Sequence, residues 1–126
     1  MNLVLLAALG GALGSAARYL VNVGAGRLIG MAFPWGTLIV NVVGCFIMGV
    51  LIGLGAHRIT LTNEARVFMM TGILGGFTTF SAFSADFMLL IERKNFGLAT
   101  LYLTGSVALS LLAVFAGLHL IRLWQT

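Results

Sequence analysis

Four long stretches of almost uninterrupted apolar residues constrain this chain more than any other feature. They run roughly from Leu3 to Val23, Phe33 to Ala56, Ala65 to Ile91, and Gly97 to Trp124. Each is long enough for a helix that crosses the hydrocarbon core of a bilayer, which takes about 20 residues. The chain is 60% hydrophobic and only 8% charged, whereas soluble domains carry about 25% charged residues. The sequence therefore predicts an all-α membrane protein, with residues 1–126 forming a single domain of four transmembrane helices.

Small residues recur at four-residue spacing in the first two segments. Gly10 and Gly14 form one such pair, and Gly49 and Gly53 form another. This spacing lets helix backbones approach closely in a membrane. We interpret these glycines as packing residues.

Positive charges are divided almost equally between the two ends of the predicted helices. Arg58, Arg66 and Arg122 lie on one side, and Arg27, Arg93 and Lys94 lie on the other, with Arg18 near that end of the first helix. A clear imbalance is needed before the positive-inside rule fixes an orientation. Four helices do not easily enclose a pathway alone, so we predict a dual-topology, inverted (antiparallel) homodimer in the inner (plasma) membrane, surrounded by lipid. The alternative is that loop length or another factor fixes one topology.

The third segment is interrupted by the polar stretch "GGFTTFSAFSAD", residues 75–86. If its helix starts near Ala65, Gly75 lies about 15 Å along it, which is half of the roughly 30 Å hydrocarbon core. Adjacent glycines weaken a helix, and threonines compete for its backbone hydrogen bonds. We predict that the third helix is broken at the midplane, where irregular backbone is tolerated only if it is buried or lines a cavity. The alternative is a continuous helix with glycine at a tight crossing.

A break at that depth would free backbone carbonyl groups, and transporter folds use such breaks to bind ions. In an inverted dimer the break can lie on the two-fold axis, so that carbonyls from both subunits meet at one point. Neutral oxygens suit a small hard cation such as Na⁺. Asp86 lies two or three turns further on and forms no carboxylate pair that would hold a divalent ion there.

Phe80 and Phe83 lie three residues apart and share one face of the half-helix after the break. The edge of an aromatic ring is positive because its quadrupole is negative on the face. Ring edges directed into a narrow pore would favour an anion. The alternative is that both rings serve only packing.

Uncharged hydrogen-bonding side chains form rows on two other helices. Tyr102, Ser106 and Ser110 follow one another at four-residue spacing on the fourth helix, and Thr37 and Asn41 do so on the second. Rows of donors can replace the hydration shell of a small anion, although serines also join helices to one another.

Two further polar residues, Arg18 and His119, lie outside these rows. Arg18 is the cation placed within a predicted helix, and it either snorkels to the interface or lends positive potential to a vestibule. His119 is expected at the interface, near the end of the last helix.

Taken together, these motifs resemble the Fluc/CrcB family of small fluoride channels. The resemblance is carried by "GGFTTFSAF", by "GSAARY" with Arg18, by "GTLIVNVVGCFIMG" with Asn41, and by the length and four-helix layout. The family usually has Thr where this chain has Ala82, which removes a hydroxyl beside the phenylalanines.

The resemblance implies a homodimer with two antiparallel fluoride pores and passive export of fluoride. It implies a structural Na⁺ bound by the backbone carbonyls of Gly75 and Thr78. It places Phe80 and Phe83 along the pore, with Asn41 supporting them. The predicted pore residues are completed by Ser81, Tyr102, Ser106 and Ser110.

Other functions fit the sequence less well. A dual-topology exporter of hydrophobic cations needs a membrane-embedded carboxylate, and the first 60 residues contain no Asp or Glu. A non-transporting membrane assembly subunit leaves the polar rows and the midplane break unexplained. We see no nucleophile–base pair typical of an enzyme, and no basic run suited to nucleic acid.

Overall fold

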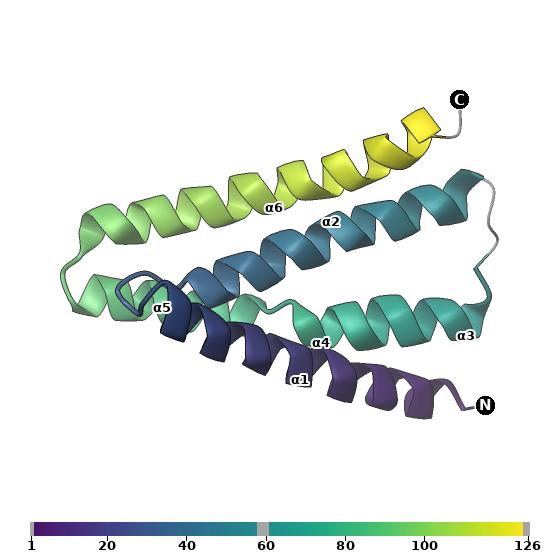
Figure 1. Ribbon diagram of the computed structural model, residues 1–126, viewed down its shortest axis with the longest axis horizontal. Helices are drawn as coiled ribbons and strands as arrows, with labels where there is room; N and C mark the ends of the chain where they lie inside the picture. Colours follow the sequence, from purple (N-terminus) through teal and green to yellow (C-terminus); the bar gives the residue numbers. More distant parts are fainter. Residues whose placement is uncertain (1, 58–60, 125–126) are drawn as a thin grey trace.

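The computed structural model describes residues 2–57 and 61–124, and it consists of long helices running back and forth (Figure 1). Four helical spans are long and apolar enough to cross a membrane. The predicted all-α membrane fold with four spans is therefore confirmed. The first and last described residues lie at the same end of the molecule (Figure 1). Arg58 lies outside the described residues.

The first span is α1 (Leu3–Leu28), which is five residues longer than predicted. Asn2 caps its start by accepting a hydrogen bond from the Val4 N–H. The glycine-containing stretch 24–28 lies beyond the predicted segment and is helical. Ala25 within it is buried, so packing stabilises this last turn beyond its intrinsic propensity. The helix ends at Leu28, and the chain turns away at Gly30, whose φ of 104° is readily adopted only by glycine.

The second span is α2 (Trp35–His57) and the last is α6 (Phe96–Trp124). Both run in the same direction and lie side by side (Figure 1). A Cβ at Gly49 would overlap the Val114 carbonyl, and a Cβ at Gly117 would overlap the Phe46 carbonyl. The two backbones therefore touch directly, which fixes the register of one helix against the other.

The third span consists of four pieces: α3 (Asn63–Arg66), the π-helix η1 (Val67–Leu74), α4 (Gly75–Phe77) and α5 (Phe80–Glu92). The whole span covers 30 residues, Asn63–Glu92, and the break at Thr78 and Thr79 falls at its middle. The glycines and the threonines were both expected to weaken the helix here. Gly75 and Gly76 are helical, whereas Thr78 and Thr79 are extended, with ψ values of 156° and 125°. The π-helix has no counterpart in our sequence prediction.

Tight packing against α1 explains why Gly76 stays helical. A Cβ at Gly76 would lie 2.6 Å from the Gly11 carbonyl, and one at Gly14 would overlap the Ile73 carbonyl. The two helices thus approach at backbone distance along η1 and α4. Gly10, Gly14 and Gly49 lie at such backbone contacts, and Gly53 lies against the Ile121 side chain, so the predicted packing role of these glycines is confirmed.

Candidate functional site

Three helices bring Thr37, Asp86 and Tyr102 together. The Thr37 hydroxyl donates to Asp86 Oδ2 at 2.8 Å, and the Tyr102 hydroxyl donates to the same oxygen at 3.1 Å. Thr37 is 5% exposed and Tyr102 is fully buried. Our sequence reasoning assigned Asp86 no place in the site. An acidic side chain within a membrane span was itself the signal that could have found it.

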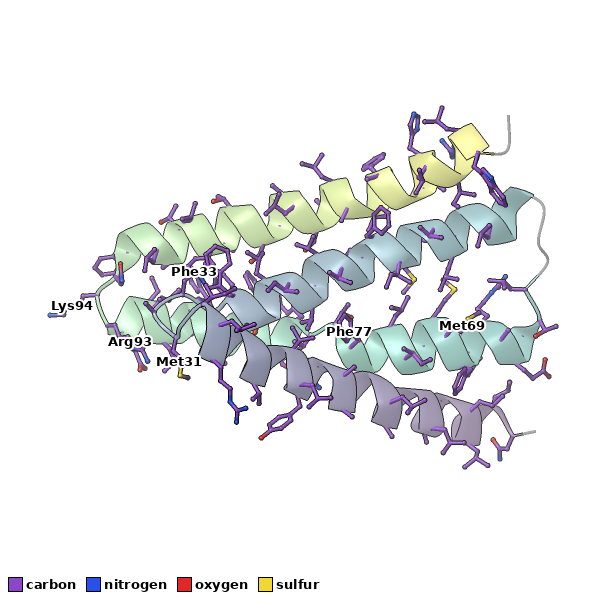
Figure 2. All side chains as sticks on the ribbon, viewed as in Figure 1. Met31, Phe33, Met69, Phe77, Arg93 and Lys94 are labelled. Carbon is purple, nitrogen blue, oxygen red and sulfur yellow. The ribbon has the colours of Figure 1, made fainter. Side chains whose placement is uncertain are left out.

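A cavity lies on either side of this triad. The first, of about 260 Å³, is lined by Thr37 and Asp86 and extends to the loop between α1 and α2, to Asn22 on α1 and to Arg93 beyond α5. Phe33, Met31 and Arg93 gather at this end of the molecule (Figure 2). The second cavity, of about 250 Å³, is lined by residues of α2, the break, α5 and α6. The triad therefore lies between the two cavities, because Thr37 and Asp86 line the first and Tyr102 contacts Phe83 in the wall of the second.

The second cavity collects most of the residues that the sequence predicted for the pore: Asn41, Phe80, Phe83, Ser106 and Ser110. Tyr102 adjoins it, because its ring centroid lies 5.0 Å from that of Phe83. Ser81 is not among the lining residues and lies exposed, 3.3 Å from the Thr79 hydroxyl. The structure thus brings together six of the seven residues proposed for the pore.

Aromatic rings form a continuous row past the triad. Phe33 meets Tyr102 edge to face, with centroids 5.4 Å apart and planes at 87°. Tyr102 contacts Phe83, and Phe83 lies 5.6 Å from Phe80. Phe83 is 7% exposed and Phe80 is 78% exposed, so the row runs from the interior of the chain to its open face.

Asn41 holds the break by two hydrogen bonds to one residue. Its Nδ2 donates to the Thr79 carbonyl at 3.0 Å, and its Oδ1 accepts from the Thr79 N–H at 2.8 Å. The Thr79 side chain in turn caps α5 by accepting from the Ala82 N–H at 3.1 Å. The amide group of Asn41 therefore replaces backbone partners that the unwound segment has lost.

These bonds leave two carbonyls without their usual helical donors. In a continuous helix the Gly75 carbonyl would accept from the Thr79 N–H, and the Thr78 carbonyl would accept from the Ala82 N–H. Those two N–H groups donate to the Asn41 and Thr79 side chains instead. Gly75 is exposed and Thr78 is half-buried, so both oxygens remain available at the middle of the span.

The carbonyl of Gly76, between them, is taken by Arg18. The Arg18 Nε donates to it at 3.0 Å, and the side chain is half-buried. Arg18 thus lies at the helix break and is not among the residues that line the two cavities described above. His119 is exposed near the end of α6.

Ser106 differs from the other polar residues of the site. Its side chain is 5% exposed, and within the described part of the chain its buried hydroxyl has no hydrogen-bond partner. A buried hydroxyl without a partner costs about 1–3 kcal/mol. At the wall of the second cavity, this hydroxyl is free to donate to a ligand.

The fold and this site define a four-span membrane protein with a polar and aromatic pathway between its helices. A family model described as "CrcB-like protein, Camphor Resistance (CrcB)" matches residues 5–118. A Rhodospirillum centenum protein is 54% identical over 122 residues, covering 97% of each chain. A Cereibacter sphaeroides protein is 57% identical over 97% of this chain and 96% of its own length. Both relatives carry the name "Fluoride-specific ion channel FluC".

The chain therefore belongs to the CrcB family, as its sequence motifs predicted. It is a multi-pass integral membrane protein, which in bacteria lies in the plasma membrane.

Proposed function

We propose that this protein is a fluoride-selective ion channel that lets F⁻ leave the cell passively. The relatives that match nearly its whole length are named as fluoride-specific channels, and a channel is not an enzyme. The observation that carries the proposal furthest is the unpartnered, buried hydroxyl of Ser106, which lines a cavity beside Phe83. A small anion that accepts hydrogen bonds strongly would satisfy this donor.

The arrangement of donors explains a preference for fluoride. Ser106 and Ser110 line the cavity opposite Asn41, and among the described residues of this wall none is charged. Neutral donors and ring edges can replace part of the hydration shell of F⁻ without holding the ion so tightly that it cannot leave. Beyond them, the hydroxyls of Thr37 and Tyr102 donate to Asp86, so an anion at that level competes with this carboxylate for both donors.

Two features of the chain support an antiparallel homodimer with two pores. Phe80 is 78% exposed although its ring continues the row of Phe83 and Tyr102. Gly75 is exposed as well. A second copy in the opposite orientation would cover the ring and complete a pore on each side. The nearly equal division of Lys and Arg permits both orientations.

The central Na⁺ is part of this proposal. The carbonyls of Gly75 and Thr78 have lost their helical donors, so each chain offers two neutral oxygens at the midplane. Two chains offer four, a donor set that fits a hard monovalent cation. Na⁺ bound there would neutralise the carbonyl dipoles and join the two breaks. The Arg18 guanidinium donates to the Gly76 carbonyl. Among the described residues of the break, it makes no such bond to the carbonyls of Gly75 and Thr78, which are the two assigned to the ion.

Passive export follows from the chemistry of hydrogen fluoride. The neutral acid crosses membranes, dissociates at the higher internal pH, and leaves F⁻ trapped inside. A channel that conducts F⁻ lets it leave down its gradient and confers fluoride resistance.

The test is anion efflux from liposomes that contain the purified protein. A fluoride electrode should record rapid F⁻ loss, and a chloride electrode on matched liposomes should record at least a hundredfold less Cl⁻ loss. Comparable rates for the two anions would exclude a fluoride-selective pore. Proton-coupled uptake of a hydrophobic cation by the same liposomes would support the exporter, and the absence of any flux would support an assembly subunit.

A further inference from the structure

Cys45 continues the two rows of polar side chains on α2 and α6, which pair residue by residue at successive levels along the helices. The helices are parallel (Figure 1). Thr37 and Tyr102 share Asp86 at the first level, and Asn41 and Ser106 line the second cavity at the next. A third step of four residues on both helices gives Cys45 and Ser110, which line the same cavity.

The surroundings of this thiol are those of a ligand site. Cys45 is a free, half-buried cysteine, and the cavity measures about 250 Å³. The Ser106 hydroxyl at the wall of the same cavity is buried without a partner. The rings of Phe80 and Phe83 complete the wall.

We propose that Cys45 forms a binding site for a soft, thiophilic monovalent cation, Ag⁺, inside the fluoride pathway. Thiolate sulfur is the soft ligand among protein side chains. Binding breaks the S–H bond, forms an S–Ag bond and releases the proton, with no change of oxidation state. The product is neutral, which suits a cavity whose described lining carries no charge. The bound silver fills the third level and blocks the passage of F⁻.

The proposal rests on the proposed channel function, and the chain provides a clean test because Cys45 is its one cysteine. Fluoride efflux is measured in chloride-free buffer, where silver fluoride stays dissolved. Micromolar Ag⁺ should slow efflux through the unmodified protein at least tenfold, and dithiothreitol should reverse the block by removing the silver. The ratio of rates with and without Ag⁺ should be near one in Cys45→Ser.

Two matched variants in the Cys45→Ser background locate the site. Ser110→Cys restores a thiol at the third level from the opposite helix and should restore block. Leu111→Cys places a thiol one residue further along α6, on a side chain that is 59% exposed, and should stay insensitive. Equal block of Cys45→Ser and the unmodified protein, or no block of either, would overturn the proposal.

A second measurement separates this proposal from the channel function itself. The folded protein is treated with a small methanethiosulfonate, which forms a disulfide with Cys45 and releases a sulfinic acid, and its intact mass is recorded. Cys45 should react, and prior Ag⁺ should prevent the reaction. A protein that passes no fluoride but shows this protection refutes the channel and retains the silver site, whereas a thiol that Ag⁺ does not protect refutes the site.

Discussion

Replacing Asn41 by alanine tests the physical account of the helix break most directly. The variant removes both hydrogen bonds to Thr79, one of 3.0 Å to its carbonyl and one of 2.8 Å from its N–H. The Thr79 N–H has no helical carbonyl to return to while the break persists. A buried donor left without a partner costs about 1–3 kcal/mol, and the second bond contributes about 0.5–1.5 kcal/mol more.

These terms give an expected loss of about 1.5–4.5 kcal/mol in the free energy of unfolding. We expect a value near the lower end of this range, because the polar groups of the unfolded chain find other hydrogen-bond partners in a membrane. Unfolding is measured by titration with SDS in mixed micelles, followed by the fluorescence of Trp35 and Trp124. Asn41→Asp keeps the acceptor for the Thr79 N–H and loses the donor to its carbonyl, so fluoride efflux should fall while stability falls less than in the alanine variant.

The control is Asn22→Ala, which deletes the same amide group from α1. Asn22 is exposed, and no hydrogen bond of its side chain is found among the described residues. Its unfolding free energy should change by less than about 0.5 kcal/mol. Equal stabilities for Asn41→Ala and Asn22→Ala would refute the reasoning that a side-chain amide holds the break.

Three further predictions follow from the packing and the charges. Phe80→Ile and Phe83→Ile should each reduce fluoride flux at least tenfold while lowering the free energy of unfolding by only about 1–2 kcal/mol. Both variants are tested with Ala82 and with Thr restored at that position. If the variants form folded dimers that conduct fluoride at the parental rate, both rings are packing residues. Gly14→Ala should destabilise the fold by more than about 3 kcal/mol because its Cβ would overlap the Ile73 carbonyl. Gly24→Ala has open space around it and should stabilise the fold by up to about 1 kcal/mol. Similar thermal stabilities of the two variants would contradict the close contact between α1 and the third span. A cysteine introduced in the 57–64 loop of Cys45→Ser should be labelled from outside intact cells on about half of the chains, and labelling of nearly all or none would rule out dual topology.

The sequence alone determined the four spans, because hydrophobic length in a membrane is a local property of the chain. It also located the interrupted third span and the rows on α2 and α6, since four-residue spacing places side chains on one helix face. Of the residues expected to break the helix, the two threonines unwind and the two glycines do not. Gly76 packs against the Gly11 backbone of α1 and stays helical, and the amide of Asn41 stabilises Thr79 in an extended conformation.

Only the tertiary structure decided which polar groups meet. Asp86 is 49 residues from Thr37 and 16 from Tyr102 along the chain, and Arg18 is 58 from the Gly76 carbonyl that it contacts. No periodicity links residues at such separations, because the pairing depends on how helices are rotated and shifted against one another. Close backbone contacts at Gly14, Gly49 and Gly117 fix that register. The sequence specified which donors each helix carries, and the packing of the glycines determined which of them share a cavity.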